Sequence, residues 1–398
     1  MTQATTPRDI TRAWWATVAL FLVHGLVVST WLSRIPAVQS ALRLNNGVLG
    51  LTFLCAAIGA VVTIPLAGWL VTRYGSRRVS ASSSLLFPVV ISPLPFASSA
   101  PMLAAALFVY GATAATMDVS MNAHGVEVEK AMRKPTMSRF HGMFSLGGMA
   151  GAGIGSLAAA RAVAPRTHFA IAAVVCFLLV LMVRPLLLRA REAAHPTVHR
   201  LPLSQIPAVL LALSAIGFCI LLSEGAMADW TAVYFKQVLR SGPGTAAAGY
   251  SVFSAAMAAF RFMGDLITAR LGPLRTVRAG SLVAACGLLW SLSLSAPSLS
   301  LLGFGAVGAG LSVIIPLVFG SGGRVENVSP GAGIATVTGI GYIGFLVGPP
   351  LIGFLSQLFT LRYALGVVVA CCLIAALLSG SLGRLRSPAA EPLPELHL

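Results

Sequence analysis

Long apolar segments separated by short polar connections run through almost the whole chain of 398 residues. A helix needs about 20 consecutive apolar residues to cross the hydrocarbon core of a bilayer. Twelve segments approach that length, at residues 13–34, 46–70, 79–98, 102–124, 139–160, 164–188, 206–232, 246–269, 277–296, 299–321, 332–357 and 361–383. The pattern predicts an all-α integral membrane protein with twelve transmembrane helices.

The longest polar connection covers residues 189–205 and contains two prolines. It divides the predicted helices six and six. We therefore expect an N-terminal six-helix half over residues 1–188, a cytoplasmic linker over 189–205, a C-terminal six-helix half over 206–383 and a cytoplasmic tail over 384–398.

A weak internal repeat supports this division. An offset of 199 residues places Trp31 on Trp230 and Gly142 on Gly341 while keeping the predicted helices in register. Two parallel halves related by an axis along the membrane normal form one of the known transporter architectures. We therefore expect the halves to superpose with these residues in equivalent positions.

Composition and charge fit a membrane protein. Only 10% of the residues are charged, against about 25% in soluble domains. With a cytoplasmic N-terminus, Arg261 falls within a span and seven of the 27 basic residues fall outside the cell, namely Arg34, Arg43, Arg161, Arg166, Lys236, Arg240 and Arg362. The other basic residues all lie in cytoplasmic segments. This asymmetry places both termini in the cytoplasm of a bacterial inner membrane, so the net charge of +16 needs no nucleic-acid partner.

The connection after the second predicted helix reads GWLVTRYGSRRV, residues 68–79. It resembles the signature of the major facilitator superfamily, Gly-x-Leu-Ala-Asp-Arg-x-Gly-Arg-Lys, although Thr72 stands where the family has Asp. A degenerate copy, GDLITARLGPLR, occupies residues 264–275. The resemblance implies two halves that rock around a central cavity. It also implies a cytoplasmic latch formed by Gly68, Arg73, Gly75, Arg77 and Arg78, with Arg73 near a helix end or carboxylate of the opposite half. The alternative is that Arg73, Arg77 and Arg78 are only positive-inside charges.

Polar side chains concentrate on the fourth and fifth predicted helices. Asp118 and Asn122 lie one turn apart, and His141 begins the next helix six residues before Gly147. The connection between them is expected to be a charged loop carrying Glu127, Glu129, Lys130, Arg133 and Lys134. The spacing of Asp, Asn, His and Gly resembles the fucose:proton symporter group, which implies proton-coupled movement of a sugar-like solute.

Asp118 is the leading candidate for proton coupling, and Glu224 on the seventh predicted helix is the second. An apolar environment disfavours the charged form of a carboxyl group, and acidic residues inside a membrane commonly mark functional sites. The alternative for Asp118 is a static carboxylate that is hydrogen-bonded to Asn122 or His141. The candidate substrate-binding residues are His24, Trp31, Asn122, His141 and Trp230.

Each of these residues also has a purely structural interpretation. Trp31 and Trp230, near the outer surface, could anchor the protein as aromatic-belt residues or form an outer gate on which a sugar ring stacks. Asn122 could join two helices, and His24 could be a packing residue. Arg261 and Asp265, four residues apart, could form a structural ion pair or a gate.

These features predict a monomeric secondary transporter that contains no metal or cofactor, is not an enzyme and uses a proton gradient. The first choice of substrate is a small polar, sugar-like solute. The alternative is proton-driven efflux of an amphipathic compound, because GFLVGPPLIG at residues 344–353 resembles an antiporter glycine-proline motif. A cavity lined by Asn, Gln, Trp and His would favour the sugar, whereas an apolar lining rich in Met and Phe would favour the amphipathic compound.

Overall fold

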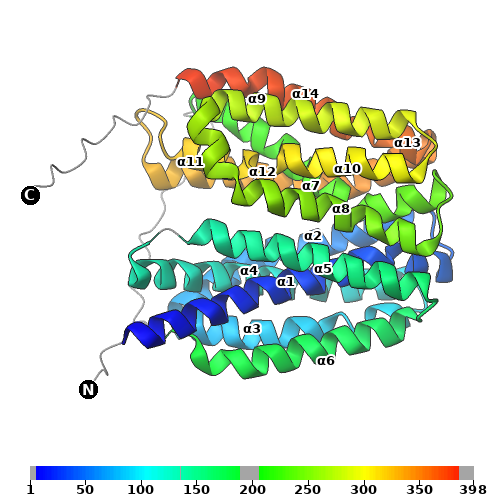
Figure 1. The fold of residues 1–398 in the computed structure, drawn as a ribbon, viewed down its shortest axis with the longest axis horizontal. Helices are drawn as coiled ribbons and strands as arrows, with labels where there is room; N and C mark the ends of the chain where they lie inside the picture. Colours follow the sequence, from blue (N-terminus) through cyan, green and yellow to red (C-terminus); the bar gives the residue numbers. More distant parts are fainter. Residues whose placement is uncertain (1–5, 135, 189–205, 385–398) are drawn as a thin grey trace, which may run out of the picture.

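The computed structural model describes residues 6–134, 136–188 and 206–384, and within these ranges it contains helices and no strand (Figure 1). The first half contains α1 (Pro7–Ala41), α2 (Asn46–Tyr74), α3 (Ser76–Val90), η1 (Leu94–Phe96), α4 (Ala100–Met132), α5 (Met137–Ala160), α6 (Pro165–Val183) and η2 (Arg184–Leu186). The second contains α7 (Ala208–Gln237), α8 (Pro243–Phe262), α9 (Gly264–Ser293), α10 (Pro297–Leu311), α11 (Ile314–Gly322), α12 (Pro330–Leu358), α13 (Leu361–Ala364), α14 (Gly366–Leu378) and η4 (Ser379–Arg384).

The prediction of twelve crossings is confirmed, with one change in how the helices divide. Among the described residues, eleven helical segments are long and apolar enough to cross a membrane, and α8 is not one of them. Its sequence is rich in Ala, Gly and Ser and includes Arg261. The eighth crossing continues past Met263 into the first turns of α9 and ends at Gly272, whose positive φ of 75° turns the chain into the ninth crossing.

Figure 1 shows α1–α6 gathered on one side of the molecule and α7–α14 on the other. Helix pairs recur between the two groups: α1 packs on α5 as α7 packs on α12, and α2 packs on α4 as α8 packs on α10. This recurrence agrees with the internal repeat in the sequence. The predicted linker 189–205 and residues 385–398 of the predicted tail lie outside the described residues.

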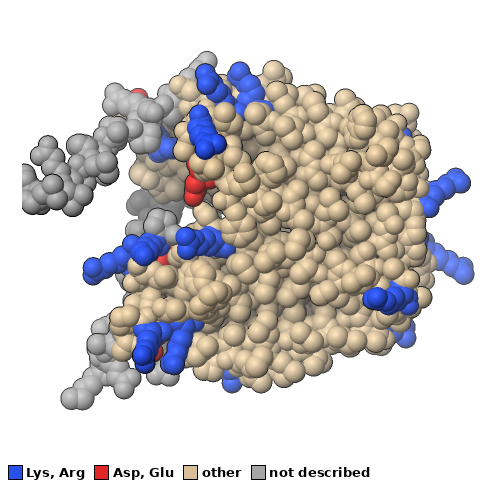
Figure 2. All heavy atoms as spheres, in the orientation of Figure 1, with Lys and Arg blue, Asp and Glu red and all other residues tan. Residues whose placement is uncertain are grey.

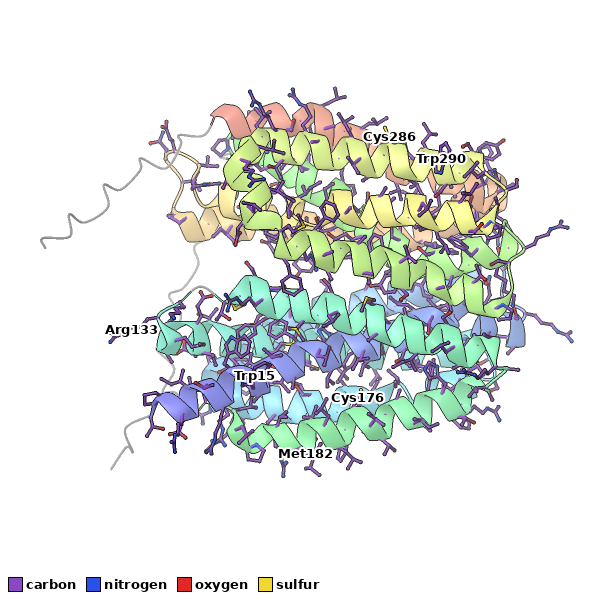
Figure 3. The ribbon with its side chains drawn as sticks, in the orientation of Figure 1. Trp15, Arg133, Cys176, Met182, Cys286 and Trp290 are labelled. Atoms are coloured by element: carbon purple, nitrogen blue, oxygen red, sulfur yellow. The ribbon has the colours of Figure 1, made fainter. Side chains whose placement is uncertain are left out.

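The two ends of the molecule differ from the surface between them. We call the end where α1 begins and η4 ends the terminal end, and the other the opposite end. On the face in Figure 2, Lys and Arg gather at these ends and leave an uncharged band between them. Figure 3 shows Trp15 toward the terminal end and Trp290 toward the opposite end, and both side chains are exposed. Exposed tryptophans at two levels are typical of membrane interfaces.

The aromatic-belt interpretation of Trp31 and Trp230 is therefore wrong. Trp31 is 2% exposed and Trp230 is fully buried. The ring of Trp230 packs edge-on against Phe53 of α2, with 5.6 Å between the centroids. The exposed Trp15 of α1 and Trp290 of α9 are better candidates for aromatic-belt residues.

The charged loop expected after the fourth span is mostly helix. Helix α4 continues to Met132, so Glu127, Glu129 and Lys130 lie on its last turns. The Glu129 carboxylate accepts hydrogen bonds from the backbone N–H groups of Thr136 (2.6 Å) and Met137 (2.8 Å). These N–H groups lie at the start of α5 and have no partner within that helix. An acidic side chain on α4 thus fixes where α5 begins.

Glycine residues bring α1 and α5 into close contact, as expected from the glycine-rich sequence of α5. A Cβ atom at Gly147 would meet the carbonyl oxygen of Leu22, and one at Gly25 would meet that of Phe144. Small residues at such positions let membrane helices pack backbone against backbone. Helices α1 and α5 therefore pack with their backbones in direct contact.

Replacing Gly147 by Ala is expected to lower the thermal unfolding midpoint in detergent, because overpacking costs about 1–3 kcal/mol. Gly339→Ala on α12 is a matched control, since among the described residues no atom beyond its own stretch of helix lies within 4 Å of a Cβ built there. Alanine is also the better helix former, so the control should unfold at the same temperature or higher. Equal midpoints for the two variants would contradict the proposed backbone contact.

Candidate transport pathway

Two chambers lie between the halves and meet at the middle of α4. The first has a volume of about 430 Å³ and extends toward the opposite end. The second has a volume of about 580 Å³ and extends toward the terminal end. Asp118, Val119 and Tyr342 line both chambers. An acidic side chain therefore stands where the two chambers adjoin.

Asp118 is half-buried and is held by its own helix. The side-chain amide of Asn122 donates to the Asp118 carboxylate at 3.1 Å and to its backbone carbonyl at 2.8 Å. Of the two hydrogen-bond partners considered for Asp118, Asn122 is therefore the one observed. The His141 ring lines the second chamber and lies edge-on to Phe21, with 5.3 Å between centroids. Among the described residues, no hydrogen bond joins His141 to Asp118.

The first chamber has an apolar and aromatic lining. Trp31, Phe53, Tyr110 and Phe345 face it together with aliphatic residues of α1, α2, α4 and α12, and among the described residues no Asn or Gln contributes to it. Its polar groups include Asp118, Asp229 and His24. His24 packs against the rings of Phe87 and Phe144, and within the described part of the chain neither of its ring nitrogens has a hydrogen-bond partner. This chamber suits the hydrophobic part of a solute.

Polar contacts between the halves close the opposite end above the first chamber. The Gln237 amide of α7 donates to Gln39 and to Asn46, both at 3.1 Å, and Asn46 donates back to Gln237 at 3.0 Å. Lys236 donates to Ser40 at 2.8 Å. Beneath them, the Trp230 ring and Phe53 pack together. These residues seal the pathway in this conformation.

The second chamber is open at the terminal end. Ser138, His141 and Asp265 line it and are exposed. Figure 2 shows acidic side-chain atoms beside a hollow between the halves at this end. Asn122, Ser312 and Thr268 add polar groups to its wall. The pathway is thus closed at one end and open at the other.

Arg261 of α8 connects three helices beside the second chamber. Its guanidinium donates to Ser145 of α5 at 2.9 Å and to the backbone carbonyl of Ser312 at 3.2 Å. It also forms an ion pair with Glu224 of α7 at 3.8 Å. Arg261 therefore joins the two halves through Ser145 and neutralises an acidic residue of α7.

The local sequence explains why the backbone carbonyl of Ser312 is free to accept a hydrogen bond from Arg261. In an unbroken helix the N–H four residues later would bond this carbonyl, but that residue is Pro316, which has no N–H. The tenth crossing breaks here, between α10 and α11. Broken membrane helices are tolerated where other groups satisfy the freed carbonyls, and Arg261 does so here.

The prediction of an ion pair between Arg261 and Asp265 is wrong. Among the described residues, the acidic partner of Arg261 is Glu224, because α8 is interrupted at Met263 and the four-residue register is lost. Ser145, Ser312 and Tyr342 were not among the site residues predicted from the sequence. Pro316 was a usable signal for Ser312, since proline frees the carbonyl four residues earlier.

The segment 68–79 comprises the end of α2, the turn at Gly75 and the start of α3, at the terminal end. Gly75 has a φ of 89°, a conformation that suits glycine, and its N–H donates to Val71 at 2.8 Å to end α2. Arg73 is exposed and, within the described ranges, has no hydrogen bond or ion pair. The expected contact of Arg73 with the other half is thus not made in this conformation.

Two helical halves around chambers that open at one end define an alternating-access membrane transporter. A family model described as Major Facilitator Superfamily matches residues 16–325, and the chain belongs to that superfamily. An uncharacterized MFS-type transporter of Yersinia pestis is 34% identical over 349 residues, covering 87% of this chain and 90% of the relative. Membrane protein MosC of Rhizobium meliloti is 29% identical over 374 residues, covering 94% and 90%.

Solved structures share the fold at low sequence identity. A bacterial homologue of the human lysosomal transporter Spinster has a TM-score of 0.76 at 13% identity, covering 96% of this chain and 100% of that one. A mutant of the nucleoside transporter NupG has a TM-score of 0.75 at 12% identity, covering 92% and 99%. The fucose:proton symporter FucP has a TM-score of 0.62 at 16% identity, covering 94% and 99%. The family predicted from residues 68–79 is confirmed.

Proposed function

We propose that this transporter moves a small amphipathic solute across the bacterial inner membrane and couples the movement to protons at Asp118. The position of Asp118 carries the proposal, because this acid lines both chambers at the point where they adjoin. A group there can meet the solute from either side as the halves rock. Acidic residues inside a membrane commonly serve as proton carriers.

The chamber linings support an amphipathic solute over a sugar. The first chamber offers aromatic and aliphatic side chains and, in the described part of the chain, no amide side chain, whereas a sugar needs several hydrogen-bonding partners. Polar groups occur closer to the terminal end, where Asn122 and His141 line the second chamber. We infer that the apolar part of the solute packs near Trp31 and Tyr110 and that its polar part points toward Asn122.

A sugar-like solute is the second candidate. The spacing of Asp118, Asn122, His141 and Gly147 resembles the fucose:proton symporter group, and FucP shares the fold. Proteoliposomes with an imposed pH gradient separate the two candidates in one screen. Accumulation of amphipathic compounds but not of monosaccharides supports the first candidate, and the reverse supports the second. Transport of either class at the same rate without a pH gradient would contradict proton coupling.

We also propose that the terminal end faces the cytoplasm and that the open chamber is therefore inward-facing. The excess of Lys and Arg in segments at the terminal end supports this orientation. Thr72→Cys at the terminal end and Ser98→Cys at the opposite end test it, since both positions are exposed. In intact cells an impermeant maleimide should label Ser98→Cys only. Labelling of Thr72→Cys alone would reverse the orientation.

A further inference from the structure

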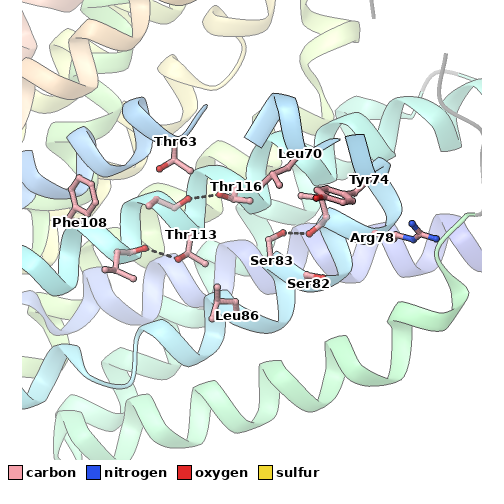
Figure 4. Close-up of a pocket in the computed structure, with 13 residues that line it drawn as sticks. Thr63, Leu70, Tyr74, Arg78, Ser82, Ser83, Leu86, Phe108, Thr113 and Thr116 are labelled. Atoms are coloured by element: carbon pink, nitrogen blue, oxygen red, sulfur yellow. Dashed lines mark hydrogen bonds between the residues drawn. The ribbon is translucent and has the colours of Figure 1, made fainter. Parts of the chain in front are cut away.

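A groove of about 540 Å³ lies on the side of the N-terminal half, over α2, α3 and α4 (Figure 4). Its lining residues differ from those of both transport chambers. Figure 4 shows Arg78 and Tyr74 at one end of the groove and Phe108 at the other. Small side chains also line it, notably Ser82, Ala112 and Thr116. The groove is thus separate from the solute pathway.

The groove faces the bilayer. Its larger side chains are strongly exposed, with Tyr74 at 50%, Leu86 at 53% and Val109 at 51%. In a helix bundle that crosses a membrane, such apolar side chains contact lipid. From Thr63 to Tyr74 the groove follows α2 for about 16 Å at 1.5 Å per residue. This is about half of a hydrocarbon core roughly 30 Å thick, so the groove spans one leaflet.

Charge divides the groove into two parts. Among the described residues, Arg78 is the only charged group in the lining, which contains no Asp or Glu. Arg73 and Arg77 lie in the same turn at the terminal end. Farther in, Thr113 and Thr116 donate their hydroxyl hydrogens to carbonyls of α4 at 2.7 and 2.8 Å. The groove therefore has a cationic end at the membrane interface and a mainly apolar interior that contains a few hydroxyl groups.

We propose that this groove binds an anionic phospholipid, with the phosphate at Arg78 and one acyl chain between α2, α3 and α4. Arginine pairs well with phosphate because its planar guanidinium offers several donors. Basic groups at the membrane surface attract anionic lipids. The apolar walls match an acyl chain, and the length of one leaflet matches its reach. The bound lipid would rest on the turn that contains the superfamily signature.

Native mass spectrometry after purification from an equimolar mixture of phosphatidylglycerol and phosphatidylcholine tests the proposal. The wild-type protein is expected to retain phosphatidylglycerol in about fivefold preference, the effect of one basic residue near an anionic surface. Arg78→Gln should lose the preference. Ser82→Phe, which keeps the charge but fills the groove, should lose the retained lipid. Lys134→Gln removes a basic residue of the terminal end outside the groove and should behave as wild type.

Thermal unfolding separates a lipid from a free phosphate compound. Phosphatidylglycerol should raise the unfolding midpoint of wild type and of Lys134→Gln but not of Ser82→Phe, whereas glycerol phosphate should leave every midpoint unchanged. An equal shift with glycerol phosphate would overturn the lipid assignment. Undiminished retention of phosphatidylglycerol by both Arg78→Gln and Ser82→Phe, with wild-type helix content, would overturn the site itself.

Discussion

Asp118→Asn is expected to reduce solute accumulation driven by a pH gradient to the level of protein-free liposomes, while solute exchange between the two sides continues. Asparagine has nearly the shape of a neutral aspartic acid but cannot release a proton. Asn122 can still hydrogen-bond a carboxamide at position 118, because its amide offers both donors and an acceptor. The chamber should therefore keep its shape and lose only the proton step.

Proteoliposomes loaded with unlabelled solute measure exchange, and the same preparation with a pH gradient measures accumulation. Glu127→Gln is the matched control, because it removes an acid of α4 that pairs with Lys130 outside both chambers. The control should accumulate solute like wild type. If Asp118→Asn also accumulated solute at the wild-type rate and with the same pH dependence, Asp118 would be structural. Glu224 would then be the leading proton carrier.

Much of this fold follows from hydrophobic length alone. A crossing of the bilayer demands about 20 apolar residues, so each transmembrane helix can be predicted from a long apolar segment of the sequence. The prediction of helix ends was less accurate where a single residue or a local change in composition determines the backbone conformation. The eighth crossing was predicted at residues 246–269, but in the structure it divides between α8 and the first turns of α9, and Gly272 sets its end through one backbone conformation.

The site could be predicted in part. Asp118 and Asn122 share one helix, so the helical repeat alone brings them together. The partner of Arg261 depends on where α7, α8 and the break after α10 meet in space, which no spacing along one helix specifies. The same limit explains the tryptophans, because sequence places Trp31 and Trp230 near the outer end but not on the lipid-facing or buried side of their helices.

Arg261→Met is expected to give the largest loss of stability among single substitutions near the second chamber. It leaves the largely buried Glu224 without a countercharge, and breaking a buried ion pair on one side costs about 3–5 kcal/mol. The Ser312 carbonyl also loses its donor, and Pro316 cannot replace it. Ser145 retains a hydrogen bond to His141 of its own helix at 3.3 Å. Thermal unfolding in detergent measures the combined effect.

Two further substitutions divide that loss between its causes. Adding Glu224→Gln to Arg261→Met removes the unpaired charge and should restore most of the stability, since replacing both members of a buried ion pair is often neutral. The remaining deficit of about 1–3 kcal/mol is that of one unsatisfied carbonyl. Adding Pro316→Ala supplies an N–H four residues after Ser312 and should recover it. No recovery by Glu224→Gln would show that the ion pair is not what Arg261 contributes.

Transport assays distinguish the stabilising role of Arg261 from a role in conformational change. Arg261 contacts Ser145 of the N-terminal half from the C-terminal half, and the second chamber must close when the opposite end opens. The triple variant Glu224→Gln, Arg261→Met and Pro316→Ala is expected to fold as stably as wild type and to remain defective in gradient-driven accumulation, because it lacks the hydrogen bond from Arg261 to Ser145 that links the halves beside the second chamber. Wild-type accumulation by this variant would reduce the Arg261 network to a stabilising device and leave Asp118 as the coupling residue.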